Sequence, residues 1–92
     1  MTLTFYYSPL CPRCRRVGKH LDDLLAPEAR RRVRRVDVLH QPLRSWRAGV
    51  RMIPALACGD ELLSGLVLDR DRITAFLAHH HLIDIPDTAK RL

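Results

Sequence analysis

Residues 3–14 read LTFYYSPLCPRC, and this stretch decides the fold. Its first part, Leu3–Tyr7, is rich in strand-forming residues, and Ser8-Pro9 follows as a turn signal. From Cys11 onward apolar residues recur at helical spacing, which predicts an amphipathic helix that ends near Pro27. The apolar stripe of this helix is Cys14, Val17, Leu21, Leu24 and Leu25. Two cysteines at the start of a helix, directly after a strand, favour redox chemistry.

Length and composition limit the number of domains and the class of protein that the chain can form. The chain of 92 residues is 47% hydrophobic and 28% charged, so we expect one core and a single domain over residues 1–92, with a frayed tail at 83–92. Two of the three cysteines are too close together to join distant segments, which disfavours a secreted disulfide scaffold. No apolar run approaches the length of a membrane span. These features predict a cytoplasmic protein.

Positive charge is concentrated in one segment. The formal net charge is +6, and Arg30–Leu39 combines five arginines with three valines. We interpret this segment as a second strand with a charged start, because valine favours strands. The arginines are interpreted as a solvated surface, with phosphate or nucleic-acid binding as the weaker alternative.

Proline and glycine mark the elements that follow. Pro42 suits the first position of a short helix, and Gly49 suits the residue after its end. Leu43 and Trp46 share one face of this helix. Further on, Gly59-Asp60 lies between two apolar runs, which predicts a hairpin with glycine at the position that a type II′ turn requires.

The last helix is expected to run from about Asp69, as its N-cap, to about Leu82. Its apolar stripe is Ile73, Phe76, Leu77 and His80. The element order is therefore β-α-β-α-β-β-α. Strands linked by a helix pair in parallel and strands of a hairpin pair antiparallel. We predict an α/β fold with a mixed four-stranded sheet and three helices.

The cysteine pair has the spacing that thiol–disulfide exchange needs. A thiolate attacks a disulfide sulfur, and the mixed disulfide is released when a second thiol within reach attacks it. Cys11 is expected at the helix N-terminus, where free backbone N–H groups, the helix dipole and nearby arginines lower the pKa of its thiol. Cys14 begins the buried stripe and should be shielded. We therefore assign Cys11 as nucleophile and Cys14 as resolving thiol, with Pro12 in the first helical turn.

A zinc site is the main alternative for the cysteine pair, and it would need two more ligands. The candidates are Cys58, His20, His40 and the run His79-His80-His81. None of them forms a second Cys-x-x-Cys pair or a His-x3-His pair, so we expect no metal site.

The sequence also predicts the exposure of the Cys58 and His80 side chains. Cys58 stands at the predicted hairpin turn without a motif around it, and we expect a semi-exposed free thiol rather than a redox or dimer-forming residue. His80 lies on an apolar stripe and should face the core, whereas His79 and His81 should face solvent.

The sequence resembles the thioredoxin-fold superfamily from Phe5 to Leu82, and within it a small glutaredoxin-like protein. The segment SPLCPRC, residues 8–14, is similar to the glutaredoxin active-site loop, and Ile53-Pro54-Ala55-Leu56 is similar to the segment in which that family places a cis-proline facing the cysteines. The resemblance implies a thioredoxin-like (glutaredoxin-like) fold and a cis Ile53–Pro54 bond. It also implies that an incoming thiol chain pairs with the backbone of Ile53 as a short strand.

The chain departs from the glutaredoxin pattern around the glutathione site. It has Ser8 and Arg13 where glutaredoxins usually have lysine and tyrosine, and Ser64-Gly65 where they have a Gly-Gly pair. Val67 and Leu68 align near the acidic positions of the family, with Asp69 one position later. The expected substrate-binding residues are Pro12, Arg13, Ile53, Pro54 and Gly65.

The sequence and the resemblance together predict a thiol–disulfide oxidoreductase that acts on protein or glutathione mixed disulfides through Cys11 and Cys14. No bound cofactor is expected. Glutathione is a candidate co-substrate, with Arg13 as a candidate partner for its carboxylate. A thioredoxin-type reductase is a candidate partner. The alternative is a redox-sensing or partner-binding module of the same fold with little turnover. We expect neither nucleic acid nor a membrane as a partner.

Overall fold

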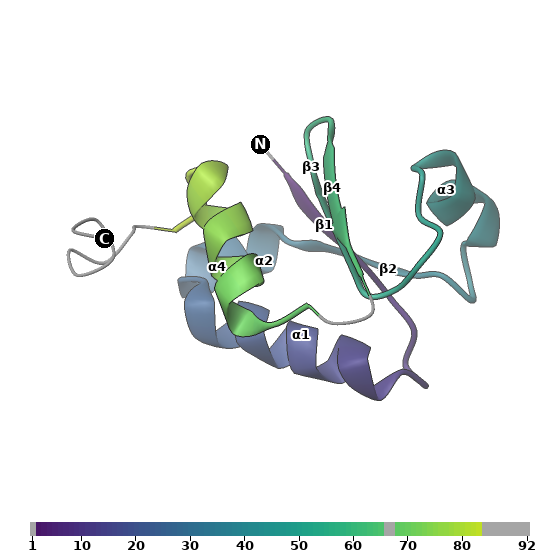
Figure 1. Ribbon diagram of the computed structural model, residues 1–92, viewed down its shortest axis with the longest axis horizontal. Helices are drawn as coiled ribbons and strands as arrows, with labels where there is room; N and C mark the ends of the chain where they lie inside the picture. The colour runs from purple at the N-terminus through teal and green to yellow at the C-terminus, as the bar shows by residue number, and fades with distance from the viewer. Residues whose placement is uncertain (1, 66–67, 84–92) are drawn as a thin grey trace.

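Figure 1 shows the computed structural model of the chain, in which residues 2–65 and 68–83 are described. The elements follow in the order β1 (Leu3–Tyr7), α1 (Pro12–Leu24), α2 (Pro27–Arg32), β2 (Arg34–Asp37), α3 (Pro42–Arg47), β3 (Ala55–Cys58), β4 (Glu61–Ser64) and α4 (Arg70–His79). Within the described residues, no helix has the length and apolar character needed to cross a membrane. The tail expected to fray lies outside the described residues from position 84 onward.

The strands form one mixed sheet in the order β2-β1-β3-β4. β1 lies inside the sheet and pairs in parallel with β2, with Tyr7 opposite Asp37. On its other side β1 pairs antiparallel with β3, with Tyr6 opposite Ala55. β3 and β4 form the antiparallel hairpin, in which Ala55 stands opposite Ser64. The predicted mixed four-stranded sheet is confirmed.

Helices lie on both sides of the sheet: α1 and α4 on one side and α3 on the other (Figure 1). The main core lies between the sheet and the pair formed by α1 and α4. Its fully buried side chains include Phe5, Leu21, Leu56, Ile73 and Leu77. Each such side chain stabilises the fold by about 1.5–3 kcal/mol relative to an exposed one. A smaller cluster on the opposite face contains Tyr6, Val36, Val50 and Ala55.

The basic segment folds differently from its prediction, because Arg30–Leu39 is not one strand. Pro27–Arg32 forms α2, and β2 begins only at Arg34. The local signals for this helix are Pro27 at its start, Glu28 in its first turn and arginines in its last turn, an arrangement that suits the helix dipole. The structure therefore adds one short helix to the three that the sequence predicted.

Cys58 is buried, so the prediction of a semi-exposed thiol is wrong. The turn consists of Gly59 and Asp60, and Gly59 has the positive φ of 61° that a type II′ turn requires at its first central position. Cys58 is instead the last residue of β3 and is 1% exposed. Because strand side chains alternate between faces, Cys58 shares the core face with Leu56. Burial raises the pKa of the Cys58 thiol, which makes it a poor nucleophile.

The last two helices begin where the sequence indicated. α3 starts at Pro42, and Gly49 beyond its end has a φ of 89°. α4 has Asp69 as its N-cap, and the Oδ1 atom of Asp69 accepts a hydrogen bond from the backbone N–H of Arg72 at 2.8 Å. His80 is buried and both of its neighbours in the sequence are exposed, as expected.

Candidate active site at the cysteine loop

The candidate site lies at the end of the sheet where β1 leads into α1 (Figure 1). Because Tyr6 pairs with Ala55, Pro54 stands just before β3 at this same end of the sheet. Ala55 also pairs with Ser64, so Gly65 follows β4 at this end too. The topology therefore brings the cysteine loop together with two distant positions that the sequence predicted as substrate-binding.

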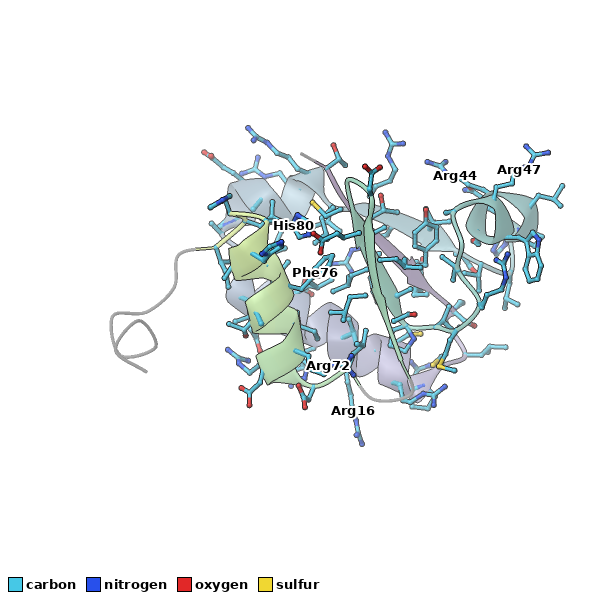
Figure 2. All side chains as sticks on the ribbon, turned by 45° about the horizontal axis from the view of Figure 1, so that its top comes forward. Arg16, Arg44, Arg47, Arg72, Phe76 and His80 are labelled. Atoms are coloured by element: carbon cyan, nitrogen blue, oxygen red, sulfur yellow. The ribbon has the colours of Figure 1, made fainter. Side chains whose placement is uncertain are left out.

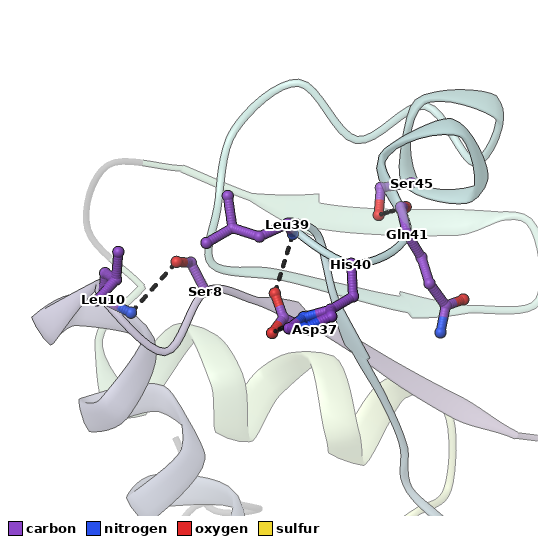
Figure 3. Close-up of polar contacts among 7 residues, drawn as sticks. All are labelled: Ser8, Leu10, Asp37, Leu39, His40, Gln41 and Ser45. Carbon is purple, nitrogen blue, oxygen red and sulfur yellow. Dashed lines mark hydrogen bonds and ion pairs between the residues drawn. The ribbon is translucent and has the colours of Figure 1, made fainter.

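Ser8 organises the loop between β1 and Cys11. Its carbonyl oxygen accepts a hydrogen bond from the Cys11 backbone N–H at 3.1 Å. Its Oγ accepts another from the Leu10 backbone N–H at 3.3 Å (Figure 3). Arg15 donates from α1 to the carbonyl of Pro9 at 3.2 Å. From the sequence Ser8 is only a turn residue, whereas its burial and hydrogen bonds show that it also holds the loop against the fold.

The two cysteines occupy different environments on α1. Cys11 is the N-cap residue with extended backbone, and Pro12 takes the first helical position. The Cys11 side chain is partly exposed, whereas Cys14, one turn further, is 2% exposed and belongs to the main core. Free backbone N–H groups and the helix dipole favour a negative charge at the N-cap. The expected difference in exposure between the two thiols is present.

Hydrogen bonds lower the pKa of the Cys11 thiol. Partial burial opposes its ionisation, but hydrogen bonds from the thiol and the backbone N–H of Cys14, and from Arg13, outweigh that effect. The pKa of Cys11 therefore lies below the ordinary value of a cysteine, and a larger share of Cys11 is thiolate near neutral pH.

The pKa of Cys14 shifts in the opposite direction. Burial raises the pKa of the Cys14 thiol to about 11, against the lowering effect of a hydrogen bond from the Ser8 backbone N–H. The Cys11 thiolate raises it further, by its charge and by accepting the proton of the Cys14 thiol. In the reduced site Cys11 therefore loses its proton before Cys14, and the Cys14 thiol donates a hydrogen bond to Cys11 once Cys11 is ionised.

The predicted substrate-binding residues differ in exposure. Pro12 and Arg13 are exposed on the first turn of α1. Ile53 is half-buried, Pro54 is buried, and the peptide bond between them is cis. Gly65 is half-buried directly after β4. The fold gathers these positions at one end of the sheet, and their roles in binding stay predictions.

Exposed apolar side chains lie on the cysteine loop and on the chain between β2 and β3. This apolar rim consists of side chains that are each at least 41% exposed, namely Leu10, Leu39, Leu43, Trp46 and Met52. Trp46 and Met52 line a cavity of about 270 Å³ together with Ile53. The Arg51 guanidinium lies over the Trp46 ring, 3.2 Å from its centre. The sequence placed Leu43 and Trp46 on one helix face, but a helical pattern alone does not show whether that face meets the sheet or solvent.

Asp37 orders the part of the rim that follows β2. Its Oδ1 accepts a hydrogen bond from the Leu39 backbone N–H at 2.9 Å, and its Oδ2 lies 2.8 Å from His40 Nδ1 (Figure 3). Desolvation opposes the ionisation of Asp37, but these hydrogen bonds outweigh it and hold the pKa of its carboxyl below the usual value. A charged Asp37 therefore holds the turn that carries Leu39.

A second cavity, of about 480 Å³, lies beside Cys14. Its charged lining consists of Arg15, Lys19, Asp22 and Arg35. Only Asp22 is acidic, and it forms a 2.9 Å ion pair with Arg35. This side of Cys14 therefore presents a net positive charge to an approaching substrate.

No protein-family model and no curated protein matches the sequence. Solved structures do match. A mutant thioredoxin from Halobacterium salinarum NRC-1 matches with a TM-score of 0.68 and 22% identity, over 92% of this chain and 77% of its own. A thioredoxin from Malassezia sympodialis matches with a TM-score of 0.69 and 18% identity, over 86% of this chain and 73% of its own.

The third match is NrdH-redoxin from Escherichia coli, which is described as a glutaredoxin-like protein. Its TM-score is 0.60 at 21% identity, and the match covers 94% of this chain and 100% of that one. The three matches show that this chain has the thioredoxin fold. The predicted fold class is confirmed.

Replacing Arg13 should make Cys11 less reactive toward iodoacetamide at neutral pH. Arg13→Ala removes a side-chain hydrogen bond that lowers the pKa of Cys11, so the midpoint of the alkylation rate should move to higher pH. The matched control is Arg16→Ala, because Arg16 projects away from the fold on the same helix (Figure 2). Mass spectrometry of the Cys11 peptide gives the rate at each pH. An equal shift in both variants would contradict the role of Arg13.

Proposed function

We propose that this thioredoxin-fold protein is a thiol–disulfide oxidoreductase in which Cys11 is the nucleophile and Cys14 the resolving thiol. The main support for the proposal is that the two thiols differ in position, burial and pKa. Cys11 sits at a helix N-terminus with a lowered pKa, and Cys14 is buried one turn away with a pKa of about 11. At the start of the reaction the nucleophile must ionise readily, whereas the resolving thiol stays protonated.

The reaction begins when the Cys11 thiolate attacks one sulfur of a substrate disulfide. A bond forms between Cys11 Sγ and that sulfur, the substrate S–S bond breaks, and the leaving thiolate takes a proton from solvent. Cys14 then loses its proton to solvent and attacks Cys11 Sγ, a bond forms between the two cysteine sulfurs, the bond from Cys11 to the substrate breaks, and the second substrate thiolate takes a proton from solvent. The substrate gains two electrons and two protons, and the Cys11–Cys14 pair becomes a disulfide.

The coupling between the thiols sets the order of these steps. The Cys11 thiolate is one of the causes that raise the pKa of Cys14. Once Cys11 is part of a mixed disulfide, its sulfur carries no negative charge. It then no longer acts as a thiolate acceptor for the hydrogen bond from the Cys14 thiol. The pKa of Cys14 then falls, so the resolving thiol is activated only after the substrate has been attached.

The apolar rim supports a protein as the disulfide substrate. Leu10 and Met52 border the cysteine loop and the Ile53–Pro54 segment, and both side chains are exposed where a polypeptide would approach. Exposed apolar side chains that surround a functional site are typical of protein-binding surfaces. A glutathione mixed disulfide is the other candidate substrate, with Arg13 as the group that meets its carboxylate. The cysteines do not form a disulfide scaffold, because Cys11 and Cys14 are close in sequence and Cys58 is buried, and this fits a reducing compartment such as the cytoplasm.

The alternative function is a redox-sensing or partner-binding module with little turnover. The same apolar rim favours it, because a partner that binds this surface tightly would leave slowly. Turnover separates the two functions: an oxidoreductase reduces many equivalents of substrate disulfide, whereas a sensor exchanges once with its partner.

Cys11→Ser should abolish reduction of insulin disulfides by the protein in the presence of dithiothreitol. Cys14→Ser keeps the nucleophile, so it should accumulate a Cys11–substrate mixed disulfide that mass spectrometry detects. Cys58→Ala is the matched control, and it should stay active because Cys58 is buried in the core. Full activity in Cys11→Ser would reject the assignment of the nucleophile.

A thioredoxin-type reductase is the reductant that we propose for the Cys11–Cys14 disulfide. The E. coli NrdH-redoxin, which matches this fold, is described as having a thioredoxin-like activity profile. This chain also has Ser8 and Arg13 where glutaredoxins usually have lysine and tyrosine. We therefore expect NADPH oxidation to be faster with thioredoxin reductase than with glutathione and glutathione reductase. Faster reduction by glutathione would contradict this choice and identify glutathione as the co-substrate.

A further inference from the structure

Glu61, His79 and His80 meet on the side of the molecule formed by the β3–β4 hairpin and the end of α4. Glu61 is the first residue of β4, and the two histidines close α4. The Oε1 atom of Glu61 lies 3.1 Å from His79 Nε2, and its Oε2 atom lies 3.5 Å from His80 Nε2. One ligand atom from each of the three residues lies within 4.8 Å of the other two. Both histidines thus aim Nε2 at one carboxylate.

His80 contributes to this cluster a buried nitrogen that makes no hydrogen bond. Its side chain is 8% exposed, and its Nε2 atom has no hydrogen-bond partner even though it points toward Glu61. Figure 2 shows His80 beside Phe76 on α4, and the two ring centres are 4.7 Å apart. The His79 ring meets the His80 ring edge-on at 5.1 Å. A buried imidazole nitrogen without a hydrogen bond is unfavourable, so an ion that His80 Nε2 binds would remove this cost.

The distances match those of a metal centre. Two ligand atoms bound to zinc at tetrahedral angles lie about 3.3–3.6 Å apart. The contacts of Glu61 use different oxygens: Oε1 lies 3.1 Å from His79 Nε2, at hydrogen-bond distance, and Oε2 lies 3.5 Å from His80 Nε2. Both distances are near that spacing, and one ligand atom from each residue lies within 4.8 Å of the other two. Two imidazoles and one carboxylate are a donor set that zinc accepts, and they leave a fourth position for water. Glu61 and His79 are both more than half exposed, so an ion can reach the cluster from solvent.

We propose that Glu61, His79 and His80 bind a zinc ion. The ion joins the start of β4 to the end of α4, two elements separated by 18 residues along the chain at the Glu61–His79 contact. It also supplies the partner that His80 Nε2 lacks. The site is distinct from Cys11 and Cys14 and uses no cysteine. The sequence predicted no metal site, because none of its candidate ligands forms a second Cys-x-x-Cys pair or a His-x3-His pair.

Titration of Zn²⁺ into the full chain, with Cys11 and Cys14 joined in a disulfide, tests the site by calorimetry. Wild-type protein should bind one equivalent. Glu61→Gln and His79→Gln should each weaken binding at least tenfold, and both side chains are exposed enough to be replaced without disturbing the core. His40→Gln is the matched control, because His40 is an exposed histidine that also pairs with a carboxylate, Asp37. Its affinity should equal that of the wild type.

Cobalt substitution identifies the ligands. Co²⁺ bound at this site should show the visible bands of a low-coordinate centre with nitrogen and oxygen ligands, without a sulfur-to-cobalt charge-transfer band. Loss of the visible bands in His79→Gln supports the site. Absence of stoichiometric Zn²⁺ binding, equal affinity in the wild type and both site variants, or a charge-transfer band from sulfur would overturn it.

Discussion

The position of β1 inside the sheet is the constraint on which the rest of the structure depends. β1 is paired on both sides, in parallel with β2 and antiparallel with β3. At the end of β1 the chain enters the loop that leads to Cys11. The register of Tyr6 with Ala55 then places Pro54 at the same end of the sheet. A shift of this register by one residue would move Leu56 and Cys58 out of the core, so the core itself holds the site in place.

The core also creates the difference between the two thiols. α1 must bury Val17 and Leu21 against the sheet, and the same helical stripe includes Cys14. One turn earlier the helix begins, so Cys11 stays at its exposed N-terminus. Packing and helix geometry therefore lower the pKa of one thiol and raise that of the other without a dedicated acid or base. The hydrogen bonds of Ser8 fix the loop that joins this helix to β1.

Local patterns predicted the elements that carry the site, because each has a signal within a few residues: the strand and turn before Cys11, Pro12 at the helix start and glycine at the hairpin. Three other features depend on information that a local pattern lacks. α2 was missed because its arginines adjoin strand-forming valines, although Pro27 and Glu28 marked its start. Cys58 was misplaced because the residue before the turn still belongs to β3, and the register of β3 in the sheet places its side chain on the core face. The cluster of Glu61 with His79 and His80 exists only in the folded chain.

The central claim is that Cys11 is the thiol that ionises first, and that its negative charge adds to burial in raising the pKa of Cys14. The most direct test is a titration by ¹³C NMR of protein with labelled cysteine, first with both thiols free and then with Cys11 capped as a methyl disulfide. We expect a pKa of about 11 for Cys14 in the reduced protein and a lower pKa once Cys11 is capped. A Cys14 pKa that stays the same or rises after capping would contradict it.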